Sequence, residues 1–230
     1  MKSKLMLVLL SVLIMSLSMA CLSSSLLPGS ESGTDETTNA QTAQEQASSN
    51  VLLSEDFSNK GSGWDVYTED LLSANYENDM YVITNDDPQS YAWGIANKFF
   101  TDTSITVDSQ LLSGPMDVES GIICRMNGDN FYYALISIDG YYGIFKSTAE
   151  DFTMIQMENM PFNNAIKLGN ETNKIRFDCI GSTLSLYVND ILLAEVNDTD
   201  YASGDIGMLV GTYDDAGAKF GFDNVVVSKP

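Results

Sequence analysis

The sequence predicts an all-β protein, built as a two-sheet antiparallel jelly-roll sandwich over residues 51–230. No window of this region shows the 3.6-residue apolar period of an amphipathic helix. Instead, short segments rich in β-branched and aromatic residues recur at regular spacing, bounded by Gly, Asn or Asp. About a dozen such segments favour two packed sheets over alternating strands and helices. The clearest candidate strands are 104–113, 121–126, 131–138, 141–146, 174–180, 183–188, 192–196 and 221–228.

The segment 131–146 combines six aromatic residues with a hairpin signal, Asp139-Gly140. A two-residue turn there pairs Ile138 with Tyr141, Ile136 with Gly143 and Ala134 with Phe145, and directs these side chains into the core. The opposite side is a mixed surface that suits the apolar face of a sugar ring and its hydroxyl groups. The alternative is that its tyrosines are ordinary strand residues. The predicted ligand-binding residues are Tyr133, Tyr142, Ser137 and Lys146, with Arg125 from a neighbouring strand and Trp93 as a further platform.

Several segments carry a family resemblance. The stretches 121–146, 184–190 (LSLYVND), 203–215 (SGDIGMLVGTYDD) and 222–227 (FDNVVV) resemble the concanavalin A-like lectin/glucanase superfamily. They are most similar to bacterial extracytoplasmic domains related to the 3-keto-disaccharide hydrolase domain and to laminin G-like modules. The resemblance implies the same jelly-roll sandwich. It leaves the activity open, because such domains include enzymes, sugar binders and modules with other roles.

The N-terminus has the layout of a cleaved signal peptide, residues 1–20: two lysines, an apolar run, then small residues before Cys21. The site resembles a bacterial lipoprotein signal, in which Cys21 is lipidated, but Ser18 and Ala20 also suit an ordinary signal peptidase. Residues 21–50 are then a lipidated cysteine and a disordered polar linker. We therefore expect an extracytoplasmic, membrane-anchored lipoprotein of the bacterial cell surface. A free secreted protein is the alternative.

The charge of the chain restricts its partners. The sequence has 11 Lys and Arg, 32 Asp and Glu, and no His. Cleavage after residue 20 removes two lysines, so 9 basic residues remain against 32 acidic ones, a net charge of −23. Such a surface repels phosphate backbones and anionic lipid headgroups. We expect no nucleic-acid partner, and contact with a membrane only through an N-terminal lipid.

Two cysteines remain in the domain once Cys21 is set aside. Cys124 and Cys179 each fall on the apolar side of their predicted strands. In an oxidising compartment such a pair favours a disulfide, and two buried free thiols are the alternative.

The absence of histidine excludes Ser-His-Asp triads, Cys-His pairs and most zinc sites. Calcium takes oxygen ligands, so it remains the one candidate metal, and no other cofactor is expected. Glu55, Asp56 and Asp223 lie near the two ends of the domain, which often meet in such sandwiches. A structural calcium ion there would resemble sites of the superfamily.

The sequence favours a binding module over an enzyme. Glucanases of the superfamily carry an E-x-D-x-x-E strand, and the nearest match, 77–82 (ENDMYV), lacks the third acid. We therefore predict non-catalytic binding of carbohydrate or another extracellular ligand. One alternative is a hydrolase of glycosides or 3-keto-glycosides, and another is a structural or adhesion module that contacts protein.

Overall fold

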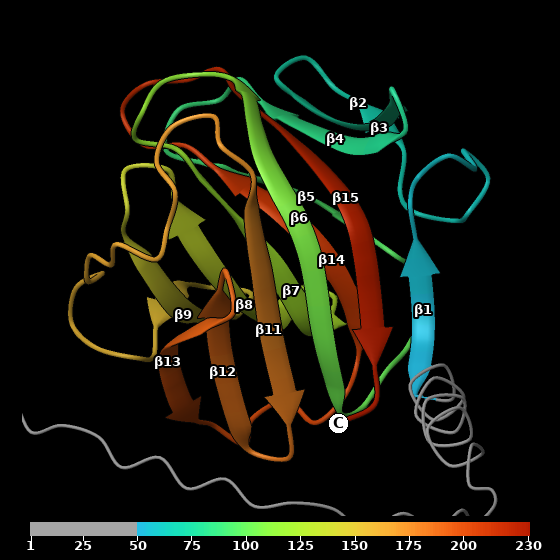
Figure 1. Cartoon of the computed structure of the whole chain (residues 1–230), viewed down its shortest axis with the longest axis vertical. Coiled ribbons are helices and arrows are strands. Elements are labelled where there is room, and N and C mark those ends of the chain that lie inside the picture. Colours follow the sequence, from blue (N-terminus) through green and yellow to red (C-terminus); the bar gives the residue numbers. More distant parts are fainter. Residues whose placement is uncertain (1–49) are drawn as a thin grey trace, which may run out of the picture. The chain divides into compact units, whose positions relative to one another are not determined.

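The computed structural model of the protein describes residues 50–230, and these form fifteen strands in two antiparallel sheets (Figure 1). This part of the chain contains no helix, and so none that could span a membrane. The strands are β1 (Val51–Glu55), β2 (Tyr67–Thr68), β3 (Leu72–Glu77), β4 (Met80–Asn85), β5 (Tyr91–Ile95), β6 (Thr103–Ser113), β7 (Glu119–Asn127), β8 (Asn130–Ser137), β9 (Tyr142–Ser147), β10 (Phe152–Met154), β11 (Asn173–Ile180), β12 (Thr183–Val188), β13 (Ile191–Asn197), β14 (Asp205–Gly211) and β15 (Ala218–Ser228). The predicted all-β jelly-roll sandwich is confirmed.

One sheet has nine strands in the order β13-β12-β11-β6-β15-β4-β3-β2, with β1 paired to β15. The other has six strands in the order β10-β9-β8-β7-β14-β5. In Figure 1 the long strands β6, β11 and β15 of the first sheet lie in front of β7, β8 and β14 of the second. The predicted signal peptide, Cys21 and linker lie outside the described residues, so these remain predictions.

The core lies between the two sheets and follows from strand alternation. In β6, for example, Ile105, Val107 and Leu111 point inward and are buried, while Thr106, Asp108 and Gln110 are half-exposed. The predicted disulfide is confirmed: Cys124 of β7 is bonded to Cys179 of β11, with Cα atoms 6.8 Å apart. The disulfide therefore joins one sheet to the other through the core.

The hairpin between β8 and β9 differs from the prediction by one residue. Ile136 pairs with Tyr142 instead of Gly143, and Gly140 takes a positive φ of 105° in a three-residue loop. A shift of one residue moves every side chain of β9 to the other face of the sheet. Tyr142, predicted on the ligand-binding side, therefore lies in the core, and Phe145, predicted in the core, lies on the opposite side.

Candidate functional site

The outer face of the six-stranded sheet carries a cluster of aromatic side chains that is separate from the core. Strand alternation places them there from four strands: two from β5, two from β8 and one each from β9 and β10. We call this the aromatic face, and its residues are Tyr91, Trp93, Phe131, Tyr133, Phe145 and Phe152.

Tyr133 is at the centre of the aromatic face and is buried beneath its neighbours. Its ring stacks on Phe145 at a centroid distance of 5.0 Å and contacts Tyr91 at 5.9 Å and Phe152 at 6.0 Å. Its hydroxyl has no hydrogen-bond partner among the described residues. The predicted role of Tyr133 as a stacking platform is therefore corrected: the ring supports the aromatic face from below and is not accessible to a ligand.

Two other predicted residues belong to the same side of the sheet. Trp93 is partly exposed, and its ring packs against Phe131 at a centroid distance of 5.9 Å. Ser137 is buried, and its hydroxyl lies 3.4 Å from the carbonyl oxygen of Val118 and bonds to Asp139. Of the predicted residues, the structure thus leaves Trp93 as the accessible platform.

Arg125 does not reach the aromatic face, because β7 contains a bulge at this residue. The pairing of β7 with β8 shifts between Cys124 and Asn127, and Arg125 has a positive φ of 55°. Its buried guanidinium donates to the carbonyl oxygens of Cys179 (3.0 Å), Gly181 (2.8 Å) and Tyr201 (2.9 Å). It also pairs with Asp102 at 3.0 Å. Arg125 therefore holds segments of both sheets together, which corrects its predicted role in ligand binding.

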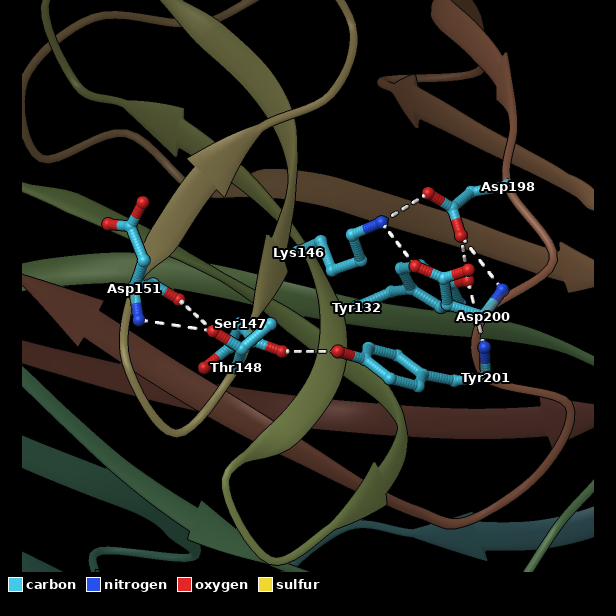
Figure 2. A network of polar contacts seen from close by, with 8 residues as sticks. All are labelled: Tyr132, Lys146, Ser147, Thr148, Asp151, Asp198, Asp200 and Tyr201. Atoms are coloured by element: carbon cyan, nitrogen blue, oxygen red, sulfur yellow. Dashed lines mark hydrogen bonds and ion pairs between the residues drawn. The ribbon is translucent and has the colours of Figure 1, made fainter.

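Lys146 is bound by an acidic loop between β13 and β14 (Figure 2). Its Nζ atom donates to Asp198 at 2.7 Å and to Asp200 at 2.6 Å. The bonds to Asp198 and then to Asp200 raise the pKa of Lys146. Burial alone would raise the pKa of Asp198, but the bonds from Lys146 and Tyr132 outweigh it and lower that pKa. The ammonium group predicted to contact a ligand is thus engaged within the protein.

Glu119 is a buried acid on the aromatic side of the sheet that sequence reasoning did not single out. It pairs with Gly211 of the neighbouring strand β14. A Cβ atom added to Gly211 would lie 2.6 Å from the Tyr91 ring and 2.8 Å from Glu119 Cγ. The missing side chain leaves room for the hydroxyls of Tyr91 and Tyr213, which donate to its two carboxylate oxygens at 3.1 and 3.2 Å. Burial raises the pKa of Glu119 from 4.5 to about 7, and these two bonds only partly oppose the shift.

The raised pKa of Glu119 predicts a stability profile. The folded state holds the proton more tightly than the unfolded state, so the contribution is complete below about pH 4.5 and is lost as the pH rises through about 7. This pKa difference corresponds to about 3 kcal/mol of the free energy of unfolding. Glu119→Gln keeps the neutral form at every pH. We therefore expect the free energy of unfolding of the variant, relative to that of the wild type, to increase by about 3 kcal/mol as the pH rises from about 4.5 to 8.

Urea unfolding of both proteins at a series of pH values measures this difference. Glu171→Gln, which removes an exposed carboxylate, is the control and should follow the wild-type profile. Parallel profiles for the wild type and Glu119→Gln would contradict the assignment.

A cleft of about 250 Å³ borders the aromatic face where the edge strand β5 meets β2 and β3 of the other sheet. The Tyr67 hydroxyl donates to the Trp93 carbonyl oxygen at 2.8 Å and joins the two sheets at this point. We call it the β5 cleft, and it is lined by Asp65, Tyr67, Glu69, Leu72, Tyr91, Ala92 and Trp93. The alternation in residues 91–95 (YAWGI) places Tyr91 and Trp93 on one face of β5, so the sequence indicated the aromatic wall of the cleft. Nothing in the sequence placed the other wall opposite it.

The acids predicted to bind calcium do not form a set of ligands. Glu55, Asp56 and Asp223 each accept a hydrogen bond from a backbone N–H one or two residues further along the chain. Within residues 50–230, no three acidic or cysteine side chains are grouped so that they could hold an ion. The ends of the domain do meet, since β1 pairs with β15.

No family model and no curated protein matches the sequence. Solved structures do match the fold. The carbohydrate-binding module CBM66 from Bacillus subtilis matches with a TM-score of 0.60 at 16% identity, covering 73% of this chain and 96% of that one. A Bacillus subtilis protein of unknown function with a galectin-like fold has a TM-score of 0.58 at 11% identity, over 78% and 96% of the two chains. The Bacillus licheniformis β-glucanase has a TM-score of 0.56 at 11% identity, over 79% and 98%.

These likenesses define the class of protein by its architecture. The chain folds as a jelly-roll sandwich of the concanavalin A-like or galectin-like kind. Proteins of this architecture include both a carbohydrate-binding module and a glucanase, so the function has to be argued from the site itself.

Proposed function

We propose that the protein is an extracytoplasmic module, tethered to the cell surface, that binds carbohydrate at the β5 cleft without cleaving it. The observation that carries the proposal is the position of Trp93, a partly exposed ring between the aromatic face and a cleft with two carboxylates. An indole ring can stack on the apolar face of a pyranose, while Asp65 and Glu69 accept hydrogen bonds from its hydroxyls. The buried rings beneath the face keep this platform rigid.

The stacking role of Trp93 gives the first binding prediction. Trp93→Ala should weaken the affinity for a bound glycan at least about tenfold, or ~1.4 kcal/mol, because the ring supplies the apolar contact. Calorimetric titration of the purified protein against a panel of oligosaccharides, with parallel detection of released sugar, measures both binding and cleavage.

Tyr187→Ala is the matched control, because this tyrosine lies in β12 of the nine-stranded sheet beneath Arg176. It should bind as the wild type does. Equal affinity of Trp93→Ala and the wild type would reject the platform. Release of sugar would instead indicate a hydrolase of glycosides or 3-keto-glycosides. If the folded protein binds no glycan, the result would favour an adhesion module that contacts protein.

The tether rests on the N-terminal sequence. The lipoprotein-like signal supports acylation of Cys21, and the polar segment that follows would hold the domain on the order of 30 Å from the membrane. Mass spectrometry of the native N-terminus tests this, since acyl chains on Cys21 add their whole mass. An unmodified N-terminus would indicate the free secreted form. The likeness to laminin G-like and 3-keto-disaccharide hydrolase-related domains stays a prediction from sequence.

A further inference from the structure

The charge around the β5 cleft narrows the class of glycan. A second cleft of about 450 Å³ adjoins it, since Glu69 and Leu72 line both. Together the two clefts are lined by four acidic residues, Asp65, Glu69, Asp70 and Asp87. None of the four forms an ion pair with a basic residue of the described chain. The negative charge beside Trp93 is therefore available to a ligand.

The aromatic face offers no opposite charge. The six strands of its sheet contain two basic residues, Arg125 and Lys146. Arg125 is buried in the bulge of β7, and Lys146 is paired with Asp198 and Asp200. A glycan with uronate, sulfate or sialate groups would meet only carboxylates at this site.

Asp65 is held in position for such a ligand. Its Oδ1 atom accepts a hydrogen bond from Asn97 Nδ2 at 2.8 Å, and its backbone oxygen accepts one from the Tyr81 hydroxyl at 2.7 Å. Asp65 is half-buried, so these bonds orient its carboxylate beside a cleft whose other wall is aromatic. An ammonium group satisfies both kinds of surface, because it pairs with carboxylates and is attracted to the face of an indole or phenol ring.

We propose that the ligand of the β5 cleft is a glycan with free amino groups, a polymer of 2-amino-2-deoxy sugars. Its protonated amines pair with Asp65 and Glu69 while the sugar ring stacks on Trp93. This inference rests on the proposed carbohydrate-binding function and names the class of its ligand. The net negative charge of the whole chain adds long-range attraction for such a polymer.

The test compares glucosamine oligomers with N-acetylglucosamine oligomers of the same length. The nitrogen atoms of the first carry positive charge when protonated, and the amide nitrogen atoms of the second are neutral. Calorimetric titration of the purified protein should give at least tenfold tighter binding of the free-amine oligomer. The double variant Asp65→Asn with Glu69→Gln should lose at least fivefold of that affinity, a larger factor than it loses for the N-acetylated oligomer. Neither substitution is expected to disturb folding, because the amide oxygen introduced at position 65 can still accept the bond from Asn97, and thermal unfolding checks this.

A second double variant, Glu158→Gln with Glu171→Gln, is the matched control. It removes the same charge from exposed positions outside both clefts and should bind the amine oligomer like the wild type. An equal loss of affinity for the amine oligomer in both double variants would show that the protein attracts a polycation nonspecifically, and would overturn the inference. So would equal affinity for the two oligomers, or binding of neutral glycans alone. In those cases the proposed function would stand, whereas binding to no glycan at all would overturn both.

Discussion

Replacing the disulfide by Cys124→Ala with Cys179→Ala is expected to lower the free energy of unfolding by about 4 kcal/mol. The bond closes a loop with a sequence separation of 55 residues. In the chain-entropy model, opening a loop of this length in the unfolded state restores about 4 kcal/mol of conformational freedom. Both cysteines are fully buried between the sheets, so lost packing adds to the effect. Urea unfolding of the oxidised wild type and the double variant measures the difference.

Reduction supplies an internal control for this prediction. A reductant should destabilise the wild type and leave the double variant unchanged, since only the wild type has this bond to lose. Equal stability of the oxidised wild type and the variant would show that the bond does not constrain the unfolded chain.

Arg125→Met should cost about as much, roughly 3 to 5 kcal/mol, because it leaves buried carbonyl oxygens without a donor. The change removes four charge-assisted hydrogen bonds and leaves the carbonyl oxygens of Cys179, Gly181 and Tyr201 without this donor. The side chain is 2% exposed, so water cannot readily replace the guanidinium. Chemical unfolding of the variant measures the loss.

Asp102→Asn is the matched control, because it removes the ion pair and keeps the bonds from Arg125 to the carbonyl oxygens. Asp102 is 46% exposed, so this change should cost about 1 kcal/mol or less. Similar costs for Asp102→Asn and Arg125→Met would show that the ion pair, and not the carbonyl contacts, carries the stability.

The disulfide and Arg125 should also be coupled. Arg125 follows Cys124 in β7, and its guanidinium donates to the carbonyl oxygen of Cys179. Residues that share a backbone segment show non-additive effects on stability. Both features join β7 to β11, so this end of the sandwich is fixed from two directions. The β5 cleft lies elsewhere, at the edge strand β5, so the variants of the disulfide and of Arg125 are expected to leave the proposed ligand site unchanged.

The sequence alone was enough for the features that depend on strand alternation. Period-two patterns predicted the strands, the inward direction of Cys124 and Cys179, and the side of the sheet that carries Tyr133. The turn at Asn189-Asp190 is also a local feature: both residues take positive φ, and Val188 pairs with Ile191.

Tertiary structure decided the features that depend on how one strand meets another. A one-residue change of register placed Tyr142 in the core, and a bulge turned Arg125 away from the aromatic face. Rings from four strands buried Tyr133, although its own strand pattern is that of a surface residue. The β5 cleft requires strands of both sheets to lie side by side. Alternation is set by the backbone of a single strand, but register, bulges and clefts are set by packing between segments far apart in the chain.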